Sequence, residues 1–290
     1  MSLTPEQIGA LARDALAREA VLSPKPGLVD AENSGSHKDM DVALLLTSAS
    51  ALEPYLTRFA VRGMQDASCS PEGRLSIIRA DGREAESAMF AATGGVNTHK
   101  GALFLLGVLC YSAGYCFANG AFSARDVCAA GAKLCEGITA ELGDSAGRAF
   151  ARYGARGARG EAEDGFPHAL EAMHAFRCAR EQGATERDAW LVSLLGLIAS
   201  LEDANVLARC GETIARELRG RAEKIALRYP AGGTSLAGEI RALDRDCMAW
   251  NASPGGAADL LACAMFFSTL EDKNKDLSEK CRVSKYGIQL

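Results

Sequence analysis

Apolar residues recur at helical spacing along most of the chain, and this pattern restricts the fold more than any other feature. Thr4-Pro-Glu-Gln7 reads as a capping box with proline in the first turn, and Ser123 opens another helix. Further helical patterns cover 42–62, 84–93, 102–117, 169–182, 186–201, 204–219, 235–250 and 257–270. Alternating β-branched runs are absent, and only 75–78 is compatible with a short strand. The sequence therefore predicts an all-α fold of about nine or ten helices.

The helical patterns follow one another without a recognisable linker or a repeat of about 20–50 residues. With 48% hydrophobic residues, a chain of 290 residues can bury one sizeable core. We expect a single compact helical domain over residues 1–271, with functional loops between its helices. Residues 272–290 are polar and lack a pattern, so they are predicted to form a frayed C-terminal tail.

Charge and cysteine content restrict the functional class. A net charge of −5 gives no electrostatic basis for binding nucleic acid. The longest apolar run, 101–117, is short for a bilayer span, and the N-terminus lacks the pattern of a signal peptide. The ten cysteines form no CxxC pair and lie mostly in Ala-rich runs. We therefore expect a cytoplasmic protein with no membrane or nucleic-acid partner; the sequence does not specify its oligomeric state.

Glycines occur together with charged and amide side chains in five connections between the helical patterns. These connections are 23–40, 94–101, 153–167, 202–209 and 251–259. Glycine lets the backbone approach a ligand closely, and the N-terminus of a following helix attracts anions. All but the third connection run directly into a helical pattern. Lysine and arginine, which bind phosphates, occur in these connections together with carboxylates, which bind Mg²⁺. This combination favours a metal–polyphosphate ligand.

Each connection also has a purely structural interpretation. Glycine and Asp259 before a helix are ordinary capping residues, and the Arg-Gly run of 156–160 is compatible with a solvated turn. His99 is compatible with a core position. His168 and His174 are interpreted as structural, as are Cys210 and Cys247. The joint occurrence of five such connections favours the functional interpretation.

Five segments resemble the triphosphoribosyl-dephospho-coenzyme A synthase family: 23–30, 35–40, 95–101, 157–163 and 253–261. They occur in the family's order and cover roughly residues 5 to 270. The fourth connection departs from the family pattern, with Ala204 where threonine is common and Cys210 where glycine is common. Ala257 likewise stands where the family often has serine. These departures bear on the detailed roles of the fourth connection.

The resemblance implies a transferase. It would join the 5-triphosphoribosyl group of ATP to the ribose 2′-hydroxyl of 3′-dephospho-coenzyme A and release adenine. The product would be the prosthetic-group precursor of the acyl carrier protein of citrate lyase or malonate decarboxylase. The family's α-linked product, formed from β-linked ATP, implies one inverting displacement. Mg²⁺ is the expected cofactor, and ATP and dephospho-coenzyme A are the expected partners.

The expected roles follow from this reaction. One carboxylate should accept the proton of the acceptor hydroxyl, and the candidates are Glu161, Glu163 and Asp203, with Glu163 preferred. Asp30, Asp39 and Asp259 are the expected Mg²⁺ ligands. The candidates for binding the phosphorylated substrates are Lys25, His37, Asn97, His99, Lys100, Arg156, Arg159, Asn205, Gly255 and Gly256.

Two other functions remain open from the sequence. A metal-dependent hydrolase of a nucleotide or ADP-ribose-type ligand would use water in place of the acceptor hydroxyl. A non-catalytic helical module would bind nucleotide or a carrier protein without turnover. Dependence of adenine release on dephospho-coenzyme A separates these alternatives from the transferase.

Overall fold

The computed structural model describes residues 3–121, 123–141, 152–229 and 236–286. Within these residues the chain forms eleven α-helices, one 3-10 helix and no strand, which confirms the predicted all-α fold with slightly more helices than expected. The elements are α1 (Pro5–Val21), α2 (Val42–Gln65), α3 (Leu75–Ala92), α4 (Lys100–Ala118), α5 (Ala124–Leu134), η1 (Ile138–Glu141), α7 (Gly157–Glu163), α8 (Pro167–Glu181), α9 (Glu186–Ser200), α10 (Ala204–Arg228), α11 (Leu236–Trp250) and α12 (Gly255–Tyr286).

Three local expectations differ from the structure. The proposed strand at 75–78 is wrong, because these residues form the first turn of α3, whose buried Ile78, Ala85 and Met89 recur at helical spacing. The third connection contains the short helix α7. The last helix continues past its apolar pattern to Tyr286, so most of the segment predicted as a polar tail is helical.

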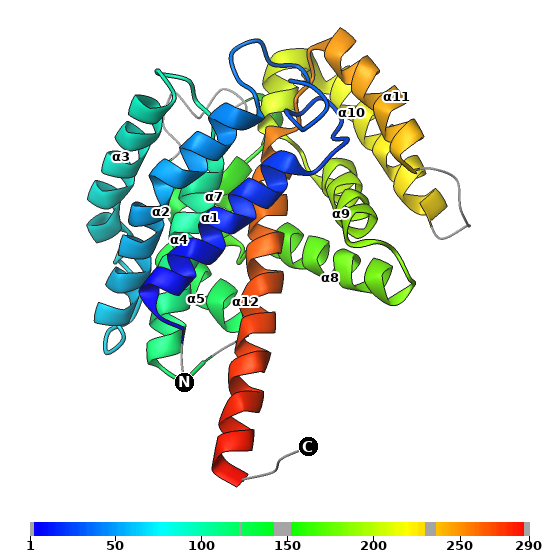
Figure 1. Ribbon diagram of the computed structural model, residues 1–290. Helices are drawn as coiled ribbons and strands as arrows, with labels where there is room; N and C mark the ends of the chain where they lie inside the picture. Colours follow the sequence, from blue (N-terminus) through cyan, green and yellow to red (C-terminus); the bar gives the residue numbers. More distant parts are fainter. Residues whose placement is uncertain (1–2, 122, 142–151, 230–235, 287–290) are drawn as a thin grey trace.

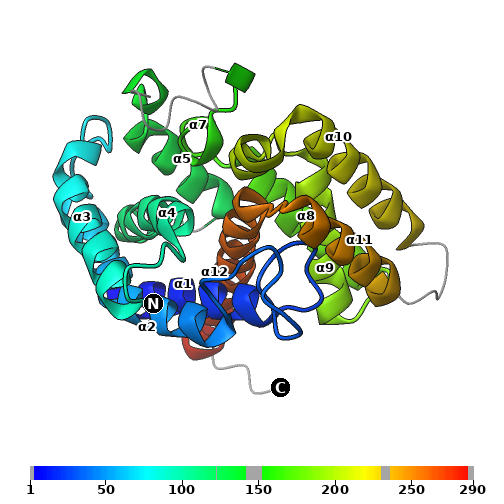
Figure 2. The same cartoon turned by 90° about the horizontal axis from the view of Figure 1, so that it is seen from above.

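Helix α12 lies at the centre of the molecule and organises the core (Figure 1). It packs against α1, α4, α8 and α9, which surround it when the molecule is seen from above (Figure 2). Its residues from Leu260 to Phe267 are almost fully buried. Because α12 starts at the fifth glycine-rich connection, the core helix also fixes the position of that connection.

Helix α4 is the second core helix, and its burial explains its composition. By length and apolarity it is the one described helix that could cross a membrane, or one of two if the bent pair of α9 and α10 is counted as a span. Of its apolar window, 78% is buried against the rest of the protein. The hydrophobicity of α4 is therefore accounted for by packing.

Glycines allow α1, α2 and α4 to approach one another closely. A Cβ atom at Gly63 of α2 would lie 1.9 Å from the carbonyl oxygen of Tyr111, and one at Gly114 of α4 would lie 2.1 Å from that of Ala60. A Cβ at Gly9 of α1 would lie 2.1 Å from Thr57 Oγ1. The backbones are thus too close for any larger residue, which fixes the second half of α4 against α2.

We predict opposite effects for alanine at two helical glycines. Gly63→Ala should destabilise the protein by at least about 2 kcal/mol, because the backbone of α4 must move away. Gly82→Ala in α3, where no atom lies within 4 Å of the new Cβ, should stabilise it by about 0.5–1 kcal/mol. Denaturant unfolding of both variants measures the difference. Equal stability of the two variants would contradict the close approach of α2 and α4.

Candidate active site

The five glycine-rich connections meet around one cavity of about 780 Å³. Each connection contributes to its wall, for example through His37, His99, Arg156, Asn205 and Asp259. The sequence-based prediction that these distant segments converge is therefore confirmed. A second cavity of about 290 Å³ adjoins the first and shares Leu201, Glu202 and Asp203 with it.

Most of the sequence-predicted site residues lie at the main cavity. Those that line it are Lys25, His37, Asp39, Asn97, His99, Lys100, Arg156, Glu161, Asp203, Asn205, Gly255, Gly256 and Asp259. Three predicted residues are not among the lining residues: Asp30, Arg159 and Glu163.

Asp203 links two helix N-termini at the cavity wall. It is the N-cap of α10, and its Oδ1 accepts from the backbone N–H of Asn205 at 2.8 Å and of Val206 at 3.2 Å. Its Oδ2 accepts from Ala257 N–H, in the first turn of α12, at 3.2 Å. A Cβ at Gly256 would lie 2.9 Å from this Oδ2, so glycine allows the approach. Burial raises the pKa of Asp203, and these backbone hydrogen bonds oppose that effect.

Asp259, about one turn after Gly255 in α12, reaches the N-terminus of α4. The backbone N–H of Ala102 stabilises its charge, and a Cβ at Gly101 would lie 2.0 Å from its Oδ2. Burial is the main cause that raises the pKa of Asp259 well above its usual range, and the nearby Asp203 and Glu19 carboxylates add to it. Asp203 and Asp259 therefore lie near each other at the cavity, and neither forms an ion pair with the residues described.

Two predicted site residues of the first connection already have partners within the protein. The buried Lys25 ammonium lies 2.5 Å from Glu19 Oε1 and donates to the Glu19 carbonyl at 2.6 Å. Both oxygens of Asp30 accept backbone N–H groups, from Lys25 at 2.6 Å and from Glu32 and Asn33 at 2.7 and 3.0 Å. Asp30 thus holds the turn together, and it lies outside the cavity because its acceptors face its own loop.

Two histidines at the cavity are predominantly neutral. His99 Nδ1 lies 2.9 Å from Ser48 Oγ, and burial with the nearby Lys25 charge lowers the pKa of His99 to about 4. Its buried Nε2 has no hydrogen-bond partner in the described part of the chain. His37 Nε2 lies 2.8 Å from Ser253 Oγ, and burial also lowers the pKa of His37. His99 can therefore bind a ligand as a neutral group, without contributing charge.

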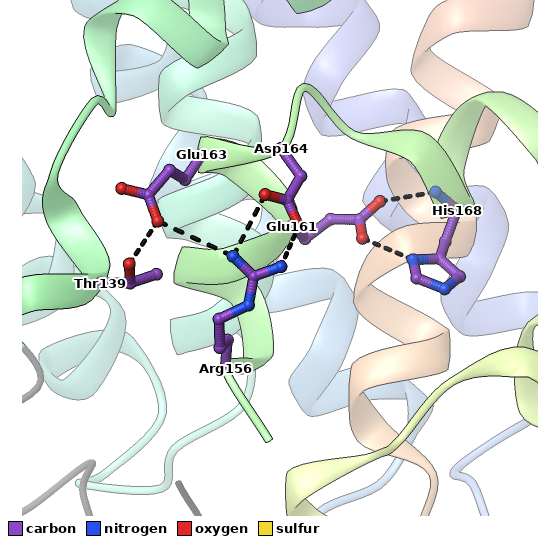
Figure 3. Close-up of polar contacts among 6 residues, drawn as sticks. All are labelled: Thr139, Arg156, Glu161, Glu163, Asp164 and His168. Carbon is purple, nitrogen blue, oxygen red and sulfur yellow. Dashed lines mark hydrogen bonds and ion pairs between the residues drawn. The ribbon is translucent and has the colours of Figure 1, made fainter. Parts of the chain in front are cut away.

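The third connection separates two acids that are only two residues apart. Glu161 points toward His168, whereas Glu163 hydrogen-bonds Thr139 and lies 3.9 Å from Arg156 (Figure 3). Arg156 forms its closer ion pair with Asp164. Residues two apart on a helix project in different directions, so only one of the two glutamates can face the cavity. Arg159, the third predicted residue outside the cavity, donates to the Glu141 carbonyl at 3.1 Å.

His168 and Arg209 are cavity residues that the sequence analysis did not include among its candidates. His168, interpreted as structural, lines the cavity at the start of α8 and contacts Glu161. Its place directly after the third connection was the available signal. Arg209 also lines the cavity, donates to the Ser36 carbonyl at 3.3 Å and forms no ion pair with the residues described. Lys100, by contrast, directs its ammonium to Glu86 at 2.5 Å.

None of the cysteines whose side chains the structure describes lines the cavity. The nine described cysteines are free thiols, and burial raises the pKa of Cys116, Cys135 and Cys247 to about 12. Cys210 directs its Sγ to the Trp250 carbonyl at 3.3 Å, which fits the interpretation of this residue as a packing group.

The donors present fit a metal ion that arrives with a phosphorylated ligand. The cavity has more carboxylates than lysine and arginine side chains, and Lys25 and Arg156 are already paired with Glu19 and Asp164. Within the described ranges no cluster of three or more histidine, cysteine or acidic side chains forms a complete metal site. Mg²⁺ commonly binds one or two carboxylates together with substrate phosphates. The carboxylates of this cavity could therefore supply part of the ligands of such an ion, and the phosphates of the substrate would supply the rest.

Comparisons with known proteins agree on one family. Residues 5–278 match the family described as CitG, ATP:dephospho-CoA triphosphoribosyl transferase. A 2-(5''-triphosphoribosyl)-3'-dephosphocoenzyme-A synthase from Pectobacterium atrosepticum is 41% identical, over 86% of this chain and 84% of the relative. Proteins of the same name from Haemophilus ducreyi and Klebsiella pneumoniae are 38% and 36% identical, over 91% and 92% of this chain and 88% and 91% of the relatives.

The raised pKa of Asp259 predicts a pH-dependent gain in stability on its removal. Because Asp259 ionises more readily in the unfolded chain than in the folded protein, it lowers stability once the pH exceeds the ordinary carboxyl pKa of about 3.9. In metal-free buffer, Asp259→Asn should raise Tm at pH 8 by roughly 2–4 °C, equivalent to about 1 kcal/mol, and have no effect near pH 3.

Thermal unfolding in EDTA across this pH range measures the effect. Asp41→Asn is the matched control, because Asp41 caps α2 without lining the cavity, and it should show no such gain. A lower Tm for Asp259→Asn at pH 8 would show that the carboxylate is not strained by its surroundings.

Proposed function

The chain belongs to the ATP:dephospho-CoA triphosphoribosyl transferase family, and we propose that it joins the 5-triphosphoribosyl group of ATP to the ribose 2′-hydroxyl of 3′-dephospho-coenzyme A. Adenine is the leaving group. The observation that carries this proposal is the convergence of all five connections on one cavity, because a two-substrate transfer needs both ligands held at one place. The adjoining smaller cavity offers further room for the acceptor beside the donor.

Charge balance supports a role for Mg²⁺. A triphosphate would meet a cavity rich in carboxylates, so its binding requires added positive charge. Asp259 and Asp39 are the residues that hold the ion in this proposal, with the remaining ligands coming from the phosphates and water. The ion neutralises phosphate charge and fixes the triphosphoribosyl group. We place this ATP-dependent reaction in the cytoplasm as part of the same proposal.

The triphosphate must be gripped without being cleaved, because it leaves with the product. Helices α4, α10 and α12 begin at the cavity wall, where Asp203 and Asp259 already accept some of their first N–H groups and partly offset the positive ends of the helices. Arg209 provides a guanidinium that is free of carboxylate partners among the described residues, and His99 provides a ring nitrogen without a partner. These groups together can bind phosphate oxygens at several points.

The transfer itself requires a proton acceptor for the ribose hydroxyl. The hydroxyl oxygen forms a bond to C1′ as the bond from C1′ to adenine N9 breaks, through an oxocarbenium-like state. Of the three predicted bases, Glu163 is turned toward Thr139 and does not line the cavity, and Glu161 is paired with the His168 side chain. Asp203 lines the cavity, its carboxylate accepts hydrogen bonds from the backbone, and burial raises its pKa, which strengthens it as a base, so it takes this role.

Incubation with ATP, Mg²⁺ and 3′-dephospho-coenzyme A, followed by mass analysis, tests the function. We expect free adenine and the joined nucleotide in equal amounts, and no product in EDTA. Adenine release without the acceptor would instead support the nucleotide hydrolase. Binding of ATP with thermal stabilisation but no turnover would support the non-catalytic module.

Substitution of Asp203 tests the assignment of the base. Asp203→Asn keeps a capping oxygen for α10 but cannot accept the proton, so kcat should fall by about 10²–10⁴-fold. Asp41→Asn again serves as the control, because it changes a helix cap outside the cavity. Full activity of Asp203→Asn, with an unchanged Tm, would remove Asp203 from the reaction.

A further inference from the structure

Glu161 holds His168 in a fixed orientation at the cavity. Glu161 Oε2 lies 2.7 Å from His168 Nδ1, and Oε1 accepts the backbone N–H of His168 at 2.9 Å (Figure 3). Oε1 also accepts the backbone N–H of Ala169 at 3.2 Å. The glutamate side chain is only 4% exposed, whereas the histidine side chain is 32% exposed. The carboxylate is therefore fixed by the first turn of α8, and the imidazole remains accessible from the cavity.

We propose that His168 donates the proton that adenine needs in order to leave, and that Glu161 is its positioning residue. The inference rests on the proposed transferase function. An ionised carboxylate only accepts hydrogen bonds, so Nδ1 carries its hydrogen toward Glu161. Nε2, for which no partner occurs among the described residues, is then the nitrogen that exchanges a proton with a ligand in the cavity.

The proposed step balances as follows. The C1′–N9 bond breaks and its electron pair stays on the purine. The Nε2 proton of His168 moves to N7 or N3 of adenine, which leaves as a neutral base, and His168 becomes neutral. The proton of the acceptor hydroxyl goes to the carboxylate at the other side of the reacting carbon. Without protonation adenine would leave as an anion, which is a much poorer leaving group.

The other cavity histidines are less suited to this donor role. Burial lowers the pKa of both His99 and His37, so both favour the neutral form near neutral pH. The Glu161 hydrogen bond is the main cause that raises the pKa of His168, opposed by partial burial. Glu171, on the same helix, and Asp164, which is paired with Arg156, add to the rise. His168 is thus the cavity histidine that favours its cationic form.

Substitution of His168 gives the first test. His168→Gln should lower kcat by about 10²–10⁴-fold, while the KM values for ATP and dephospho-coenzyme A change little. His174→Gln is the matched control, because His174 lies on the same helix and does not line the cavity. Unchanged kcat in His168→Gln would overturn the proposal.

Deaza analogues of ATP separate a proton donor from a structural residue. If His168 protonates N7, 7-deaza-ATP should react slowly with the wild-type enzyme, and His168→Gln should cause no further loss with it. If the proton goes to N3, 3-deaza-ATP shows this behaviour. A full additional loss with both analogues would mean that His168 supports the fold alone, and would contradict the proposal.

The pH profile tests the role of Glu161. A donor must be protonated, so kcat should fall as the pH rises through the raised pKa of His168. Glu161→Gln removes the charge that raises this pKa, and the alkaline fall should move to lower pH. An alkaline limb at the same pH in both proteins would overturn the positioning role.

These results are distinguishable from failure of the function itself. Wild-type protein that forms no joined nucleotide would refute the transferase and this inference with it. Wild-type turnover with a fully active His168→Gln variant would refute the inference alone.

Discussion

The site depends on the hydrogen bonds that the Asp203 carboxylate accepts from the N-termini of α10 and α12. Gly256 makes this close approach possible. Because α12 is the central helix of the fold, the contact ties the fourth and fifth connections to the core. Asp259, one turn further, extends the same arrangement to the start of α4. Core packing and site geometry are therefore consequences of the same helix.

This arrangement places acids where an anionic substrate is expected to bind. In the free protein the repulsion between these acids is offset only partly, by backbone N–H groups and by the ion pairs that Lys25 and Arg156 form. The result is a strained group of carboxylates that a metal-bound triphosphate would relieve. The repulsion between these carboxylates lowers the stability of the free protein. Binding of the metal and the triphosphate would restore that stability. The chemistry proposed for Asp203 and His168 uses the pKa shifts that the same surroundings produce.

The apolar periodicity was sufficient to predict the all-α fold and the positions of most helices. It failed at Leu75–Ile78, because a four-residue segment with three apolar residues cannot distinguish a strand from one turn of a helix. The glycine and charge content identified the connections that meet at the cavity. It could not identify which acids face the ligand. Asp30 and Asp203 both accept hydrogen bonds from backbone N–H groups that follow them, but Asp30 closes its own turn, whereas Asp203 also joins a second helix. The role of His168 could not be predicted from residue spacing, because its partner Glu161 lies in a different helix, α7, before the turn that leads into α8.

A crystal structure with Mg²⁺ and ATP tests the central claim most directly. The account predicts that the triphosphate lies against the N-termini of α4, α10 and α12, with Mg²⁺ between its phosphates and Asp259, and with Asp203 still bridging the two helices. Density for ATP outside the cavity formed by the five connections, or a metal bound at Asp30 and Glu163, would contradict it.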